Sequence, residues 1–242
     1  MNKKNINLLI FLFLNLTVFH SQNIEGRITY LASAKNALNY VQNKKDKKHI
    51  RKHVNEIYKK AKDVEVVLKF NNLISEYYAV KKMDLRNKEE FNFTYLMSGS
   101  SKKYYTYNSI MGYKSNTLDC YLLGECFLIE NLIPEWELKQ DTKTIGGFLC
   151  YKAILRNKKT KKITLEAWYS PKIPYNYGIM DLYGLPGMIL EINKNTLTIT
   201  AIKIELNPIE KIIIKEPKKI KKLSRKEFEI LKRKSFSEFY KK

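Results

Sequence analysis

The sequence predicts a mainly β protein, in which an antiparallel sheet forms a sandwich or an incomplete barrel, with a basic N-proximal helix and a basic C-terminal helix. Two observations predict the sheet. Apolar and polar residues alternate with a period of two over several short stretches, and turn signals recur about every ten residues between them. Hydrophobic residues make up 44% of the 242-residue chain, which is enough to bury a core.

The first 21 residues have the order of a secretory signal peptide. Lys3 and Lys4 give a positive start, residues 6–19 form an apolar run, and Ser21 is a small residue at the expected cleavage point. An N-terminal core helix is the alternative. No later stretch approaches the length of a membrane-spanning helix. We therefore expect an exported protein that is periplasmic, outer-membrane-associated or secreted, and not an integral membrane protein.

Residues 22–215 are predicted to form a single β-rich domain that begins with a strand at 24–31. The clearest strand covers 64–70, where every second residue from Val64 to Phe70 is apolar. The same reasoning predicts further strands at 73–81, 91–97, 102–108, 118–123, 126–131, 145–156, 161–169, 188–193, 196–206 and 211–215.

A basic helical insertion is predicted at 35–62 within this domain. Its last part has one apolar helical face, formed by Ile50, Val54, Ile57, Tyr58 and Ala61. His49 and His53 lie four residues apart beside that face, a spacing that can hold a metal ion on a helix. No third ligand accompanies them in the sequence, so we expect both histidines to be exposed to solvent beside the apolar face, and we predict no metal site.

Residues 216–242 are predicted to form a basic amphipathic helical tail. Ser224 and Glu227 match a capping box, which starts a helix. Phe228 and Leu231 then share one face of this helix. Two interpretations stay open: the apolar face packs against the protein's own sheet, or the helix lies on a membrane surface.

Positive charge is concentrated in two peripheral segments of a chain whose net charge is +21. Residues 35–62 contain 10 basic and 2 acidic side chains, and residues 211–242 contain 13 and 4, whereas residues 63–210 contain 19 and 17. Such segments attract anionic partners, although solubility alone also explains them. Most of the cations are Lys, while bidentate phosphate recognition favours Arg. We expect an envelope protein or an anionic lipid surface as partner, and no nucleic acid.

The chain contains three cysteines, so it can form at most one internal disulfide. Cys120 and Cys126 flank a turn signal at 123–125, an arrangement that suits a local disulfide in an oxidising compartment. Three separate buried thiols are the alternative. Cys150 would serve a hydrolase only if a histidine lay beside it in three dimensions, and no pattern in the sequence supports that pair.

Two blocks in the C-terminal half of the chain are distinctive. Residues 167–174 read AWYSPKIP, and residues 184–189 read GLPGMI. Pro186 and Gly187 suit the two central positions of a tight turn. Together with GFLCYKA at 147–153, these blocks resemble the GLPGLI family of exported Bacteroidetes proteins.

The resemblance covers residues 146–192 and implies an exported β-sheet fold in a cell envelope, with no catalytic residues and no cofactor. Met188 replaces the usual Leu, and Ile179 follows Gly178 where the family has Pro. The expected structural motif consists of Gly184, Leu185, Pro186, Gly187, Met188 and Ile189. The candidate binding residues around this loop are Trp168, Tyr169, Tyr177, Tyr183, Leu185 and Pro186. A purely structural corner is the alternative.

Taken as a whole, the sequence favours an exported binding or accessory protein of the cell envelope. A periplasmic carrier that holds a lipid-like ligand inside an incomplete barrel is the alternative, and it predicts a large apolar cavity. A hydrolase is the third hypothesis, and it requires a cluster of titratable groups in a cleft.

Overall fold

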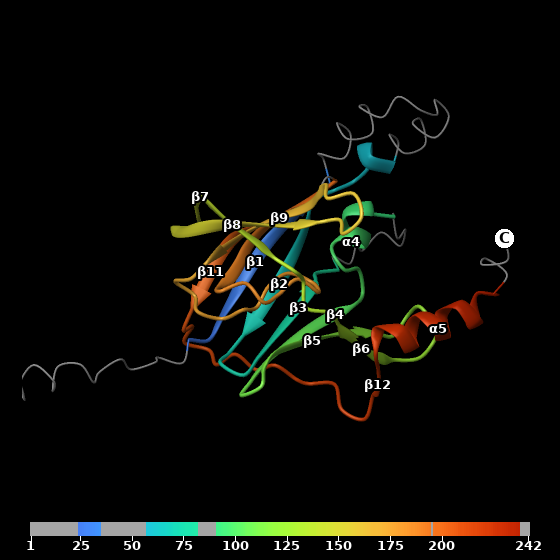
Figure 1. Ribbon diagram of the computed structural model, residues 1–242. Coiled ribbons are helices and arrows are strands. Elements are labelled where there is room, and N and C mark those ends of the chain that lie inside the picture. The colour runs from blue at the N-terminus through green and yellow to red at the C-terminus, as the bar shows by residue number, and fades with distance from the viewer. Residues whose placement is uncertain (1–23, 35–56, 82–90, 195, 238–242) are drawn as a thin grey trace, which may run out of the picture.

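One open sheet of twelve strands forms the body of the protein (Figure 1). The computed structural model describes residues 24–34, 57–81, 91–194 and 196–237. The predicted signal peptide, His49 and His53 lie outside these residues. Of the predicted basic insertion only the end is described, and residues 57–59 there are helical. The prediction of a mainly β, antiparallel fold is confirmed.

The strands in chain order are β1 (Gly26–Ser33), β2 (Val64–Phe70), β3 (Ile74–Ala79), β4 (Lys103–Ser109), β5 (Gly112–Asp119), β6 (Phe127–Asn131), β7 (Glu137–Ile145), β8 (Phe148–Arg156), β9 (Ile163–Ser170), β10 (Met188–Lys194), β11 (Leu197–Leu206) and β12 (Lys221–Leu223). The helices α4 (Phe93–Met97) and α5 (Arg225–Ser235) lie in the described part of the chain, in addition to the helical residues 57–59. The spatial order is β12-β6-β5-β4-β3-β2-β1-β11-β10-β9-β8-β7. Neighbours are antiparallel except β12 and β6, which run parallel.

The first strand lies near the middle of the sheet because it pairs with both β2 and β11. Ile28, Tyr30 and Ala32 are fully buried, whereas the residues between them are half-buried. This alternation places one face of β1 against the main core, as the period of a strand requires. Figure 1 shows β8 and β9 on one side of β1, and β5 and β6 on the other.

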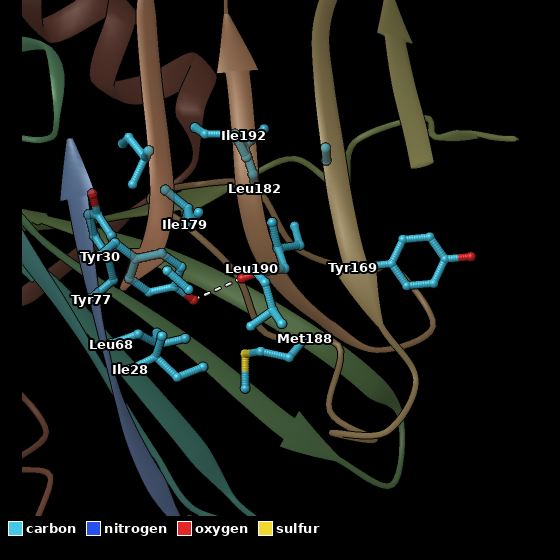
Figure 2. Close-up of a cluster of buried hydrophobic side chains, with 14 of the residues drawn as sticks. Ile28, Tyr30, Leu68, Tyr77, Tyr169, Ile179, Leu182, Met188, Leu190 and Ile192 are labelled. Atoms are coloured by element: carbon cyan, nitrogen blue, oxygen red, sulfur yellow. Dashed lines mark hydrogen bonds between the residues drawn. The ribbon is translucent and has the colours of Figure 1, made fainter. Parts of the chain in front are cut away.

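The connection between β9 and β10 fills the inner face of the sheet. We call residues 171–187 the crossing segment. Its buried side chains are Ile173, Tyr175, Tyr177, Ile179, Leu182, Tyr183 and Leu185. All of them except Tyr183 belong to the main core cluster with the inward-facing residues of the central strands, and Figure 2 shows part of this cluster. The Tyr30 hydroxyl donates a hydrogen bond of 2.8 Å to the Ile189 carbonyl within it. Side chains of the chain itself thus occupy this space, which disfavours a lipid carrier.

The C-terminal helix packs on the edge of the sheet, as one of the two interpretations of the tail predicted. Its capping box is present, with the Ser224 hydroxyl and the Glu227 carboxylate each bonded to the other's backbone N–H. The Phe228 ring meets the Phe127 ring of β6 with centroids 6.0 Å apart. The apolar face of α5 is therefore covered, while its basic residues Lys226, Arg233 and Lys234 are exposed.

The prediction of a strand at 91–97 is wrong, because this stretch forms α4. The Asn92 side chain caps the helix by accepting a hydrogen bond of 3.1 Å from the Thr94 N–H. The helix ends at Met97, and Gly99 follows its C-cap residue with a φ of +114°, a conformation that suits glycine and prevents the helix from continuing. The run is rich in aromatic and apolar residues but lacks a strict period of two, so a cap decided its conformation.

Three further strand predictions need correction. The strand predicted at 118–123 lies instead at Gly112–Asp119, because the chain turns away into the disulfide loop after Asp119. The stretch 145–156 contains the turn between β7 and β8, where Gly146 and Gly147 have φ of +56° and +83°. Two positive φ angles are what a two-residue hairpin turn of type I′ requires. Residues 211–215 form no strand, and the parallel strand β12 follows later in the chain.

Candidate functional site

The six predicted binding residues do not gather on one surface. Tyr177, Tyr183 and Leu185 are buried in the core, and Pro186 is exposed at the turn. Tyr169 is buried and packs against Tyr151, and Figure 2 shows its ring apart from the other labelled side chains. The remaining one, Trp168, is half-buried on the opposite face of β9.

The GLPGMI motif brings two backbone segments into close approach. Gly187 has a φ of +146°, and its N–H donates to the Leu185 carbonyl at 2.7 Å. A Cβ atom at Gly187 would lie 2.4 Å from the Ser170 carbonyl oxygen, which is backbone and unable to move aside alone. The motif therefore has an architectural reason: only glycine lets the crossing segment return beside the end of β9.

A ladder of paired side chains surrounds Trp168 on the outer face, and sequence reasoning missed it. Lys143 Nζ lies 4.4 Å from the centre of the Trp168 ring and 2.6 Å from Glu191 Oε1. Lys152 lies over the same ring at 5.8 Å, and the Thr200 hydroxyl donates to Glu191 Oε2 at 3.1 Å. These groups satisfy one another across neighbouring strands, so the ladder stabilises the sheet.

One end of the sheet collects several connections that are far apart in the sequence. Pairing aligns Leu206, Gly26, Phe70, Ser75, Thr106, Ser115 and Asn131 in one row across seven strands. The turns at 71–73 and 110–111, the connection after 131 and the segment after 206 all lie beyond that row. Figure 1 shows the β4–β5 turn and the segment after β11 at this same end.

Large aliphatic side chains are exposed at this end, and we call them the apolar rim. They are Leu73, Ile110, Met111, Leu132, Ile133 and Ile209. Ile110 and Ile209 are fully exposed. Single exposed apolar residues are ordinary, and these six are notable because they share one end of the sheet. The sequence carries a signal for part of it, since Ile110 and Met111 occupy a hairpin turn where polar residues are usual.

Next to the apolar rim runs a lysine-rich stretch, residues 207–222, which we call the basic segment. Ile214 and Ile220 anchor it on the outer face of the sheet against Ile74, Tyr105 and Leu128. Its lysines are exposed, and in the described part of the chain they form no ion pair: Lys211, Lys215, Lys218, Lys219, Lys221 and Lys222. Only two acidic residues, Glu210 and Glu216, oppose them within the segment.

The cysteines form one disulfide and one buried thiol. Cys120 is bonded to Cys126 across the loop between β5 and β6. Cys150 is fully buried, and its thiol donates to the Phe148 carbonyl at 3.4 Å. Burial raises the pKa of Cys150 to about 11. Its sulfur is therefore a protonated, inaccessible thiol and lacks the thiolate character of a nucleophile.

This arrangement predicts the outcome of thiol titration. In the native protein at pH 8, we expect no reaction with a chromogenic disulfide reagent, because Cys150 is buried and the other two cysteines are bonded. Denaturation should expose one thiol, and denaturation after reduction should expose three. A reactive thiol in the native state would contradict the packing of Cys150.

The fold and one sequence block have counterparts among known proteins. A model of a family described as "Protein of unknown function (Porph_ging)" matches residues 155–191. The matched stretch contains β9, the crossing segment and the start of β10. It overlaps the blocks that resemble the GLPGLI family, and membership of that family stays a prediction. The comparison with curated proteins gave no match.

Two solved structures of PNGF-II, in the C2 and P21 space groups, are similar in fold. Each has a TM-score of 0.51 and 14% sequence identity, and they cover 88% and 87% of this chain. Both matches cover 33% of the other chain, so the present chain spans about a third of the length of those structures. At this identity the likeness concerns the fold alone.

Proposed function

We propose that this protein is an exported accessory protein of the cell envelope that docks on an anionic lipid surface. The observation that carries the proposal is the apolar rim beside the basic segment at one end of the sheet. Apolar side chains enter the interface between headgroups and acyl chains, while lysines attract anionic headgroups. The disulfide and the signal-like N-terminus support export to an oxidising compartment.

The two features suit a peripheral mode of binding. None of the described helices is long and apolar enough to cross a membrane. Each Lys close to an anionic bilayer contributes on the order of 1 kcal/mol, and each exposed aliphatic side chain adds roughly 25 cal/mol per Å² that it buries. An envelope protein whose surface has an apolar centre and acidic surroundings is the alternative partner. We favour lipid because the lysines show no regular arrangement that would match a fixed set of carboxylates on a protein.

Vesicle co-sedimentation tests the proposal. We expect the chain without residues 1–21 to bind vesicles of mixed zwitterionic and anionic phospholipid, and to release them as ionic strength rises. Lys218→Gln with Lys219→Gln should weaken binding roughly 10- to 30-fold, because two cations leave the surface. Ile110→Ser with Met111→Ser should weaken it at least several-fold without changing its salt dependence.

A matched control lies at the opposite end of the sheet. Lys159 and Lys162 are exposed in the β8–β9 connection, far from the apolar rim. Their double substitution by Gln removes the same charge and should leave vesicle binding within about twofold, because screening limits the reach of a surface charge to about 10 Å. Equal losses in both double variants, or binding that ignores vesicle charge, would contradict docking through the basic segment.

A further inference from the structure

A second candidate site lies at the other end of the sheet from the apolar rim. A pocket of about 460 Å³ opens between the end of α4, the start of β4, the end of β5 and the disulfide loop. Met180 of the crossing segment, whose φ is +56°, closes one side of it. Three separate stretches of chain, at 96–104, 119–122 and 180, therefore build this concavity, and no step of the proposed lipid docking uses it.

An ion pair between partly exposed Lys102 and buried Asp119 forms the base of the pocket. Asp119 is 1% exposed, and its Oδ1 accepts hydrogen bonds from the N–H groups of Tyr121 at 3.0 Å and Leu122 at 3.2 Å. Lys102 Nζ lies 2.9 Å from Asp119 Oδ2, and its side chain is 38% exposed. Burial alone would raise the pKa of Asp119, but the two backbone donors and Lys102 outweigh it and lower that pKa.

This pairing decides which charge a ligand meets. Asp119 Oδ2 is inaccessible and accepts no hydrogen bond of good geometry from the described residues. The negative charge of the carboxylate holds the Lys102 ammonium 2.9 Å from Oδ2, and the ammonium keeps N–H donors from which a ligand can accept hydrogen bonds. A ligand in the pocket meets Lys102, whereas Asp119 is hidden from it. Lys102 is thus the accessible charge of the lining.

The other polar groups of the pocket are hydroxyls. Tyr104 lies at its base, where burial and the carboxylates of Asp181 and Asp119 raise the pKa of the phenol well above its usual value. Its hydroxyl stays protonated and can donate a hydrogen bond. Ser100 and Ser101 add two more hydroxyls to the lining. Asp181 pairs with Arg225 at 3.5 Å, so its charge is compensated.

The upper walls are apolar and depend on the disulfide. Leu96 from α4 and Tyr121 and Leu122 from the loop line the pocket and are exposed. Tyr121 and Leu122 lie inside the ring closed by Cys120 and Cys126. The disulfide and the hydrogen bonds to Asp119 together hold this wall in place. The pocket thus combines hydrogen-bond donors at its base with apolar surface at its mouth.

We propose that this pocket binds the carboxylate end of an apolar molecule, with Lys102 on the carboxylate and Leu96, Tyr121 and Leu122 on the apolar part. The donors at the base match an anionic acceptor, and charge-assisted hydrogen bonds of this kind are the strong ones. An acyl chain and the C-terminus of an apolar peptide share this chemistry. Lys102 binds the ligand, whereas Asp119 is a positioning residue.

Calorimetric titration with four probes tests the proposal. Octanoate represents the acyl source, N-acetyl-leucine represents the peptide source, and octanol and N-acetyl-leucinamide lack the carboxylate. We expect one of the two carboxylates to bind at least tenfold more tightly than its neutral counterpart. Which carboxylate binds identifies the source. The proposal would be overturned if neither carboxylate bound up to 10 mM, or if the neutral counterparts bound equally well.

Variants connect the binding to the pocket. Lys102→Met should weaken carboxylate binding roughly tenfold or more, and because it leaves Asp119 unpaired, its folding is checked by thermal unfolding. Leu96→Asp avoids that risk, since it places a negative charge on an exposed wall of the pocket, where it repels the carboxylate of the ligand. The matched variant Leu138→Asp changes a similarly exposed leucine on β7 and should bind the carboxylate normally. Binding unchanged in Leu96→Asp would contradict the site. Lys218→Gln with Lys219→Gln should leave it intact, which separates this test from lipid docking.

Discussion

Replacement of Gly187 by alanine is expected to destabilise the protein by at least about 3 kcal/mol. The new Cβ atom would lie 2.4 Å from the Ser170 carbonyl oxygen, 2.6 Å from its carbon and 2.8 Å from Pro171 Cα. All three atoms belong to the backbone, so β9 or the crossing segment has to shift. The φ of +146° adds strain for any residue with a side chain. Chemical denaturation followed by circular dichroism measures the loss.

Gly147→Ala is the matched control for this variant. Gly147 also has a positive φ, +83°, but a Cβ atom there meets nothing within 4 Å. Its substitution retains the backbone strain without the collision and should cost about 1–2 kcal/mol. Equal losses at the two positions would mean that φ alone explains the glycine, and that the GLPGMI motif brings no close approach.

Alternation of apolar residues is the part of the fold that the sequence predicts well. From Val64 to Phe70 the predicted and observed strand coincide, because one face of β2 is buried throughout. The prediction from alternation was wrong where a helix cap or a tight turn determined the local structure. The Asn92 cap turned an apolar run into a helix, and the Gly146-Gly147 pair inserted a hairpin turn into a stretch that looked continuous.

The site was less predictable because exposure depends on long-range packing. The tyrosines of the crossing segment suggested a binding surface, yet the segment returns across the sheet and buries them. A signal for this exists, since Ile173, Tyr175, Tyr177 and Ile179 recur with a period of two and are all buried. In the same way, only the register of the sheet places the four connections of the apolar rim at one end.

The pocket, too, could not be predicted, because strand pairing brings its residues together. Lys102 and Asp119 are separated by most of a hairpin in the sequence, and the pairing of Lys103 with Leu118 brings them together. A correct assignment of β5 would have predicted this neighbourhood. The strand prediction at 118–123 placed Asp119 near the start of a strand, whereas it is the last residue of β5, and so its role at the turn into the disulfide loop was missed.

Truncation of Tyr177 is the second variant with a large expected effect. Tyr177→Ala should lower the free energy of unfolding by about 3–5 kcal/mol, the range for deletion of a buried aromatic side chain. The Tyr177 ring is fully buried and lies 5.3 Å from the Tyr175 ring and 5.6 Å from the Tyr113 ring. Its hydroxyl donates to the Asn71 carbonyl at 3.1 Å. One side chain thus joins the crossing segment to two separate parts of the sheet.

Tyr177→Phe separates the ring from the hydroxyl. It keeps the packing and loses one part-buried hydrogen bond to the Asn71 carbonyl, so we expect a smaller cost of about 1–2 kcal/mol. The ratio between the two variants measures how far packing, as opposed to the hydrogen bond, holds the crossing segment on the sheet. A cost below about 0.5 kcal/mol for Tyr177→Ala, as is usual for surface residues, would contradict this role. The Tyr177 side chain would then be accessible to a ligand, as the prediction of a binding surface around the crossing segment requires.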